Sequence, residues 1–178
     1  ENSLSVDISR LKKHDQAVQF FACFVYLDKY KWPEAQKDGY SGTFSGSGRS
    51  METSIWNLDA AYEYTCRVLD YFDSSMKEFA RSVIPVRTVR DLERCINDGN
   101  IAGGTGAKTL PGALLTVEEG GMLDSKMDRL VHFFEKGVRL LTLTWNYVNC
   151  IGDPNTGVVK LMALGLSSFG FQVVEQMN

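Results

Sequence analysis

The spacing of hydrophobic residues predicts helices and strands in alternation along the chain. An apolar run at 17–27 (AVQFFACFVYL), rich in aromatic and β-branched residues, predicts a buried strand. Apolar positions then recur at helical intervals from Leu58 to Phe79, and Asn57 is placed to cap that helix. One helical turn is expected before both, over 8–13. The chain therefore begins as helix, strand, helix.

The clearest pattern lies between residues 113 and 146. A short apolar run at 113–117 (ALLTV) predicts a strand, and 138–145 (VRLLTLTW) predicts another. Between them, Asp124 is placed to cap a helix that ends at Gly137. A strand, a helix and a strand of this total length are typical of a βαβ unit with parallel strands and a right-handed crossover.

Shorter signals complete the order of elements. Pro85 interrupts an apolar stretch at Val83–Val86, and Thr88 with Asp91 resembles a capping box that opens a short helix. A last helix, opened by Ser167 or Ser168, is expected to run to the end of the chain. Strands alternating with helices imply an α/β architecture, although the pattern alone does not separate an open sheet from a barrel.

Length and composition fit one folded domain. A chain of 178 residues with 44% hydrophobic residues is large enough to bury a core, so residues 1–178 are expected to form a single domain. Two Gly-rich stretches, at about 33–50 and 98–112, are expected to be loops. The net charge of −3 gives no indication of a nucleic-acid partner or of binding to an anionic membrane.

Cysteine usage favours a reducing compartment. The four cysteines lie far apart and include no CxxC pair, so a disulfide framework is not expected and the cytoplasm is favoured. No apolar run is long enough to span a membrane. Because the chain begins at Glu1 rather than Met, an upstream signal peptide stays an open alternative.

Two carboxylates follow the strand predicted at 113–117. Glu118 and Glu119 precede two glycines, at the end of a parallel strand where ligand-binding groups collect in α/β folds. One carboxylate is expected to point inward and the other away. On the pattern alone, a solvated acidic turn before a helix is the favoured interpretation.

Polar and aromatic residues follow the next strand. Trp145 is placed to wall a substrate pocket, and Asn146 or Asn149 to hydrogen-bond a ligand. A core tryptophan followed by an asparagine-rich turn is the better interpretation from the pattern alone. The only histidines, His14 and His132, have no partner at metal-ligand spacing, so the chain does not supply a zinc site of its own. No nucleophile motif or phosphate-binding loop is present.

Three segments together resemble the membrane (renal) dipeptidase family, zinc peptidases built on a TIM-type barrel. They are 114–121 (LLTVEEGG), 137–146 (GVRLLTLTWN) and 165–178 (GLSSFGFQVVEQMN). Their order and spacing fit the family's third strand, fourth strand and the helix before its fifth strand. The resemblance implies a partial TIM-type (β/α) barrel that holds roughly strands two to four with their helices.

The resemblance also implies two-metal chemistry on dipeptides. In this family a glutamate after the third strand bridges two zinc ions, and a metal-bound hydroxide attacks the peptide carbonyl. That glutamate corresponds to Glu119, with Glu118 as the alternative. Trp145 and Asn146 fall on the substrate side, and the tryptophan suggests a bacterial-type member.

The family's remaining metal ligands lie on strands that these residues do not include. The chain alone is therefore expected to bind zinc weakly and to be inactive, because one carboxylate does not offset the dehydration of a metal ion. The alternative is a non-catalytic α/β interaction module derived from that scaffold. In both cases exposed sheet edges are expected to favour self-association or pairing with another chain.

Overall fold

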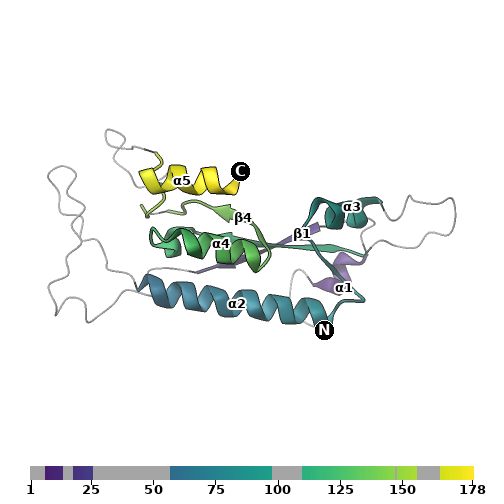
Figure 1. Cartoon of the computed structure of the whole chain (residues 1–178). Helices are drawn as coiled ribbons and strands as arrows, with labels where there is room; N and C mark the ends of the chain where they lie inside the picture. Colours follow the sequence, from purple (N-terminus) through teal and green to yellow (C-terminus); the bar gives the residue numbers. More distant parts are fainter. Residues whose placement is uncertain (1–6, 14–17, 26–56, 98–109, 147, 156–164) are drawn as a thin grey trace, which may run out of the picture. The chain divides into compact units, whose positions relative to one another are not determined.

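The computed structural model describes residues 7–13, 18–25, 57–97, 110–146, 148–155 and 165–178 (Figure 1). The first Gly-rich stretch and most of the second lie outside these residues. The chain folds into two compact units. Unit 1 comprises 1–23, 67–117 and 131–141, and unit 2 comprises 24–66, 118–130 and 142–178.

The core of unit 1 is built on an open four-stranded sheet. Strand β3 (Gly112–Glu118) pairs with β1 (Val18–Phe24), β2 (Ile84–Pro85) and β4 (Val138–Thr142). The β2–β3 pairing is parallel, with Ile84 opposite Gly112. The expected α/β architecture with a parallel sheet is confirmed.

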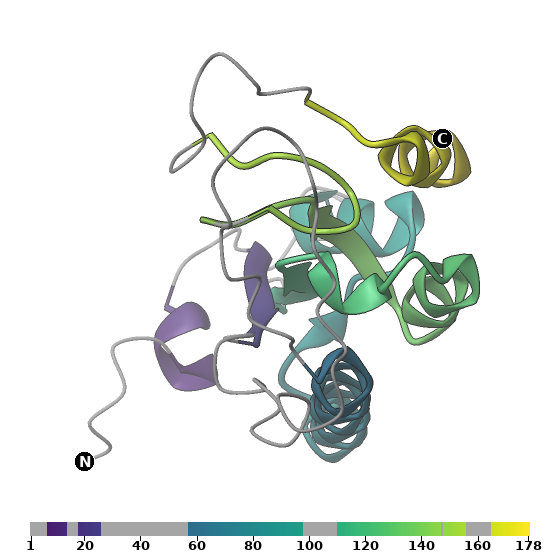
Figure 2. The same ribbon diagram turned by 90° about the vertical axis from the view of Figure 1, so that its left-hand side faces the viewer.

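Strand β3 is the most buried strand, as its apolar run predicts. Ala113, Leu115 and Val117 are each at most 3% exposed. One face of the sheet is covered by α2 (Leu58–Glu78), a single long helix that Figure 2 views along its axis. The Phe72 ring of α2 lies 5.7 Å from the Phe21 ring of β1, in a tilted arrangement. The apolar residues at helical spacing therefore mark the face of α2 that packs against the sheet.

Strand β1 is shorter and less buried than the run at 17–27 predicts. Phe21 contacts α2 and Cys23 is buried, whereas the alternate residue Phe20 is 53% exposed. Side chains of a strand alternate between two faces, and among the described residues α2 covers only one of them. The apolar run resembled a strand buried on both faces, and that part of the prediction is wrong. Residues 17, 26 and 27 lie outside the described residues.

The helix starts of the first half follow the predicted caps. Helix α1 (Ile8–Leu11) occupies the expected turn, and the Asn57 side chain accepts a 2.9 Å hydrogen bond from the Ala60 backbone N–H. Helix α3 (Val89–Asn97) begins with the expected capping box. In it, Thr88 N–H donates to Asp91 (2.9 Å) and Asp91 N–H donates to the Thr88 hydroxyl (3.2 Å).

Gly112, expected in the second Gly-rich loop, is instead the first residue of β3. A Cβ at this position would lie 2.7 Å from the Cys95 Sγ and 2.8 Å from a methyl group of Val86. The glycine is therefore explained by close packing inside unit 1 rather than by a turn. All four cysteines are free thiols in the structure.

The start of α4 (Met127–Glu135) differs from the prediction. Asp124 does not cap it; a 3₁₀ helix at Gly121–Leu123 comes first and ends at Asp124, whose backbone is left-handed at φ +52°. The three-residue 3₁₀ helix is too short to give a periodic signal in the sequence. At the other end, Gly137 has the positive φ (+98°) expected beyond a helix C-terminus.

Arg129 links α4 to the start of α2 and to the 3₁₀ helix at Gly121–Leu123. It is only 6% exposed, and its guanidinium donates to the Met122 carbonyl at 2.7 Å and to the carboxylate of Asp59 on α2. The Tyr62 ring lies under the guanidinium at 4.4 Å. Lys126 also donates to Asp59, at 3.0 Å.

Helix α5 (Ser168–Met177) is capped by Ser167, whose hydroxyl accepts from the Gly170 N–H at 2.9 Å. The start of this helix lies close to the segment that follows β4, because Ser167 N–H donates to the Ile151 carbonyl at 2.8 Å. No described helix has the length and apolar character needed to cross a membrane.

Candidate functional site

The candidate site is centred on the residue that follows β3. Glu119 is fully buried, whereas Glu118 before it is half-buried. Glu119 also has a positive φ of +85°, a left-handed conformation that costs a non-glycine residue about 1–2 kcal/mol. The inward carboxylate is therefore Glu119. Strain of this kind persists where surrounding contacts fix the residue, and it is found often at functional sites.

Three N–H groups hold the Glu119 carboxylate. Its Oε1 accepts hydrogen bonds from the Gly121 backbone N–H (2.7 Å) and from the Asn149 side-chain amide (2.6 Å). Its Oε2 accepts from the Trp145 backbone N–H (2.8 Å). Donors from two chain segments thus converge on one buried acceptor, which fixes the orientation of the carboxylate.

Burial and hydrogen bonding act on the pKa of Glu119 in opposite directions. Burial raises the pKa of this carboxyl above its ordinary value, because the charged form loses its hydration. The hydrogen bonds from Asn149, Gly121 and Trp145 lower the pKa and offset only part of the rise. Among the described residues, no basic side chain contributes to the shift.

Gly120 is required by close packing. A Cβ at this position would lie 2.4 Å from the Ile151 Cδ1 and 3.0 Å from the Leu143 carbonyl oxygen. A larger residue would therefore force the Ile151 side chain and the Leu143 backbone to shift. The Glu and the first Gly of the Glu-Gly-Gly sequence are therefore explained by a buried acceptor and a site of close approach, and the Gly121 backbone N–H donates to that acceptor.

The structure places both predicted substrate-side residues after β4, which ends at Thr142 rather than at Trp145. Trp145 is half-buried, with its ring 5.1 Å from the Phe24 ring. Beyond the end of the strand, the Trp145 N–H donates to Glu119. Asn146 is exposed. Their roles toward a substrate stay predictions.

Asn149 takes part in the site in a way that the sequence did not predict. The sequence offered it only as the alternative to Asn146 for binding a ligand, whereas in the structure its amide donates to Glu119 and to the Leu143 carbonyl (2.8 Å). Its Oδ1 accepts from the backbone N–H groups of Ile151 (2.8 Å) and Gly152 (3.2 Å).

The described residues do not complete a zinc site. They contain no cluster of three or more His, Cys, Asp or Glu side chains that could hold a metal ion. A carboxylate offers about four lone-pair positions, and three of those of Glu119 accept hydrogen bonds. The remaining position is on Oε2. His132 lies on α4, and His14 lies outside the described residues.

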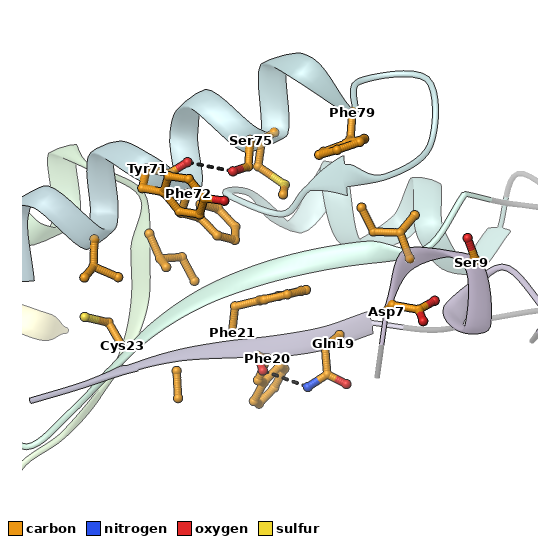
Figure 3. A pocket seen from close by; sticks show the side chains of 15 residues that line it. Asp7, Ser9, Gln19, Phe20, Phe21, Cys23, Tyr71, Phe72, Ser75 and Phe79 are labelled. Carbon is orange, nitrogen blue, oxygen red and sulfur yellow. Dashed lines mark hydrogen bonds between the residues drawn. The ribbon is translucent and has the colours of Figure 1, made fainter. Parts of the chain in front are cut away.

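A groove of about 780 Å³ lies in unit 1, between β1 and α2 (Figure 3). Its lining is mostly apolar and aromatic, and it includes Phe20, Phe21, Tyr71, Phe72 and Phe79. Glu119 and the residues that hydrogen-bond it do not line this groove. Its volume alone therefore does not make it the candidate site.

Three solved structures share the fold. A metallopeptidase described as the dipeptidase AC, of peptidase family M19, has a TM-score of 0.63 at 19% identity over 97% of this chain and 44% of its own. An amidohydrolase from Pseudomonas aeruginosa has a TM-score of 0.56 at 14% identity, over 97% and 46%. The probable dipeptidase PvdM from Pseudomonas aeruginosa has a TM-score of 0.58 at 13% identity, over 95% and 46%.

The chain spans less than half the length of these structures, and identities this low show the fold alone. No curated protein matches the chain. The open parallel sheet, with β1, β3 and β4 in neighbouring positions, is the part of a TIM-type barrel that the sequence predicts. The family model for membrane dipeptidases (peptidase family M19) matches residues 1–178. The chain therefore belongs to the membrane dipeptidase family.

Proposed function

We propose that the chain carries part of the catalytic domain of a zinc-dependent dipeptidase and that Glu119 is the residue it contributes to the metal site. Membership of the membrane dipeptidase family supports the reaction class. The observation that carries the residue assignment is the buried carboxylate at the end of β3, fixed by a strained backbone and three N–H donors.

Burial favours Glu119 over Glu118 in this role. A carboxylate that is shielded from bulk water is suited to hold and bridge metal ions, and Glu119 has no exposed surface. Glu118, the alternative ligand, is half-buried and ends β3 in an extended conformation. Trp145 and Asn146 are proposed to contact the dipeptide, because the Trp145 backbone already touches the Glu119 carboxylate.

We also propose that the isolated chain is inactive. Structural and catalytic zinc sites use at least three protein ligands, whereas the described residues bring one carboxylate to the site. We expect the described residues to orient Glu119, and the remaining metal ligands to come from further strands of the barrel. Two zinc ions and a dipeptide substrate belong to the complete site.

The test is zinc content and dipeptide hydrolysis, measured on the purified chain and on the full product of its source gene. We expect neither property in the chain and both in the full product. Stoichiometric zinc with turnover by the chain alone would contradict the inactive-fragment part. A full product that binds zinc but leaves all dipeptides intact would contradict the dipeptidase part.

The second candidate function is an interaction module, and the groove in unit 1 favours it. Among the described strands, β1 ends the strand order of the sheet, and Phe20 on it is 53% exposed. Tyr71 and Phe79 of the groove wall are 76% and 42% exposed. An edge strand beside an apolar groove suits pairing with the same edge of a second copy, in a symmetric dimer.

Sedimentation analysis separates this candidate from the first. A concentration-dependent dimer that Phe20→Lys converts to a monomer would support the interaction module. The matched control is Phe171→Lys, which alters an exposed phenylalanine (66%) on α5 in unit 2. A chain that stays monomeric at all accessible concentrations would count against it.

A further inference from the structure

We infer that Asn149 is the positioning residue of Glu119: its side-chain amide holds the carboxylate and ties it to the segment that follows β4. The inference deepens the proposed function and rests on it for the metal-ligand role of Glu119. Asn149 lies 30 positions after Glu119 in the sequence, and it contacts Glu119 through its side chain rather than through its backbone.

Asn149 uses its whole hydrogen-bonding capacity within the protein. An asparagine amide has two donor hydrogens and an acceptor oxygen with two lone pairs. The donors go to Glu119 Oε1 (2.6 Å) and to the Leu143 carbonyl (2.8 Å). The oxygen accepts from Ile151 and Gly152. A side chain with both donors and its acceptor engaged has one orientation, and it transmits that orientation to Glu119.

The two ends of the amide have separable roles. The oxygen fixes the turn at residues 149–152 through backbone N–H groups, which is a local structural role. The nitrogen reaches across to Glu119, which is the positioning role. Replacing the nitrogen by oxygen, as in Asn149→Asp, keeps the first role and removes the second, with almost no change in side-chain shape.

The nitrogen also decides how many oxygens Glu119 offers. A carboxylate that bridges two metal ions needs a free lone pair on each oxygen, but both lone pairs of Oε1 are occupied here by Gly121 and Asn149. The Gly121 donor belongs to the backbone of the 3₁₀ helix and is fixed. With Asn149 in place, Glu119 presents a free lone pair on Oε2 alone.

The test measures amide hydrogen exchange by NMR on the metal-free chain. In Asn149→Asp, the new carboxylate faces Glu119 and repels it from the N–H donors. We expect the Gly121 and Trp145 N–H groups to exchange faster by about tenfold or more, because a hydrogen bond to a charged group is lost. The N–H groups of Ile151 and Gly152 are expected to keep their protection, because the second oxygen of the new carboxylate still accepts from them.

The control variant is Val148→Asp, which adds the same charge one residue away at a position that is 47% exposed. It is expected to leave all four exchange rates within about twofold of the unmodified chain, as is usual for surface substitutions. Protection that is lost at all four groups in Asn149→Asp, or kept at all four, would overturn the positioning role.

A second measurement needs no variant. In the unmodified chain the side-chain amide of Asn149 is expected to exchange more slowly than that of Gln172, which is exposed on α5. Equal exchange of the two amides would also overturn the inference. Because no metal and no substrate are present, failure of this test leaves the dipeptidase proposal standing, and failure of the dipeptidase proposal leaves this result unchanged.

Discussion

The Asn149 side-chain amide donates a 2.6 Å hydrogen bond to the Oε1 of Glu119, a residue 30 positions earlier. This bond joins the end of β3 to the segment that follows β4, and the Trp145 N–H adds a second bond between the same two segments. The carboxylate therefore acts as a cross-link in unit 2 as well as a candidate ligand. Substitutions at Glu119 are expected to change both stability and metal binding, and suitable pairs of variants separate the two effects.

The first prediction concerns the positive φ of Glu119. Glu119→Ala and Glu119→Gly both remove the carboxylate and lose the same hydrogen bonds. Because glycine adopts a φ of +85° without strain, Glu119→Gly is expected to be more stable than Glu119→Ala by about 1 kcal/mol. Urea unfolding of the two variants measures the difference. At Glu118, which lies in β3, the order is expected to reverse, and the same order at both positions would contradict the strain argument.

The second prediction concerns the close approach at Gly120. Gly120→Ala places a Cβ 2.4 Å from the Ile151 Cδ1, so it is expected to destabilise the protein by about 1–3 kcal/mol. Ile151→Val alone is expected to cost about 0.5–1.5 kcal/mol. Because valine lacks the Cδ1, the double variant is expected to lose less than the sum of the single losses. Strictly additive losses in unfolding free energy would show that this contact does not explain the glycine.

Sequence patterns predicted the helices and strands in which apolar residues recur over many positions. Helix α2 has a long apolar face and an N-cap at Asn57, and β3 has an uninterrupted apolar run, so tertiary packing agreed with local preference at both. The inward orientation of one of two adjacent glutamates followed from strand geometry, and burial identifies it as Glu119.

The site itself was only partly predictable, because its contacts join segments distant in sequence. The hydrogen bonds of Asn149 and the Trp145 N–H depend on how the segment after β4 folds back, and no periodic pattern records that path. The same limit explains Asp124, which resembles an N-cap in sequence but ends a 3₁₀ helix in the structure. A capping pattern in the sequence marks a residue as the end of some helix, whereas tertiary packing decides which helix begins or ends at that residue.

The third prediction concerns acid stability through Asp59. Hydrogen bonds from Lys126 and then Arg129 hold the pKa of the Asp59 carboxyl below its ordinary value. The unfolded pKa is about 3.9, so the stabilisation is fully present above about pH 4 and is lost as pH falls through the lower folded pKa. Asp59→Asn is therefore expected to be less stable than the unmodified chain at pH 7, with a gap that closes toward pH 2.

Unfolding free energies at several pH values and salt concentrations check this prediction. The gap at pH 7 is expected to be about 0.2–1 kcal/mol, because the Asp59 side chain is 68% exposed, and to shrink in high salt. The matched control is Glu63→Gln, which removes an exposed carboxylate from the same helix. A gap that is independent of pH would contradict the role assigned to the Asp59 charge.

The fourth prediction concerns Arg129. Lysine at this position would preserve the positive charge but not the geometry of the guanidinium group. Arg129→Lys keeps one cation but loses the planar group that reaches the Met122 carbonyl, Asp59 and the Tyr62 ring together. We expect a loss of about 1–3 kcal/mol in unfolding free energy, because a buried carbonyl is left without its donor. Arg90→Lys, at an exposed position of α3, is the control and is expected to be nearly neutral.

The most direct test of the account is the zinc content of the full product of the source gene in two single variants, Glu119→Gln and Glu118→Gln. Substituting a residue that only hydrogen-bonds a metal ligand costs about 10–100-fold in metal affinity or activity. Removing the ligand itself, as in Glu119→Gln, is therefore expected to lower zinc affinity and dipeptide hydrolysis by at least about 100-fold each. Glu118→Gln is expected to retain stoichiometric zinc and dipeptide hydrolysis. Zinc retained by Glu119→Gln and lost by Glu118→Gln would contradict the assignment of Glu119 as the metal ligand.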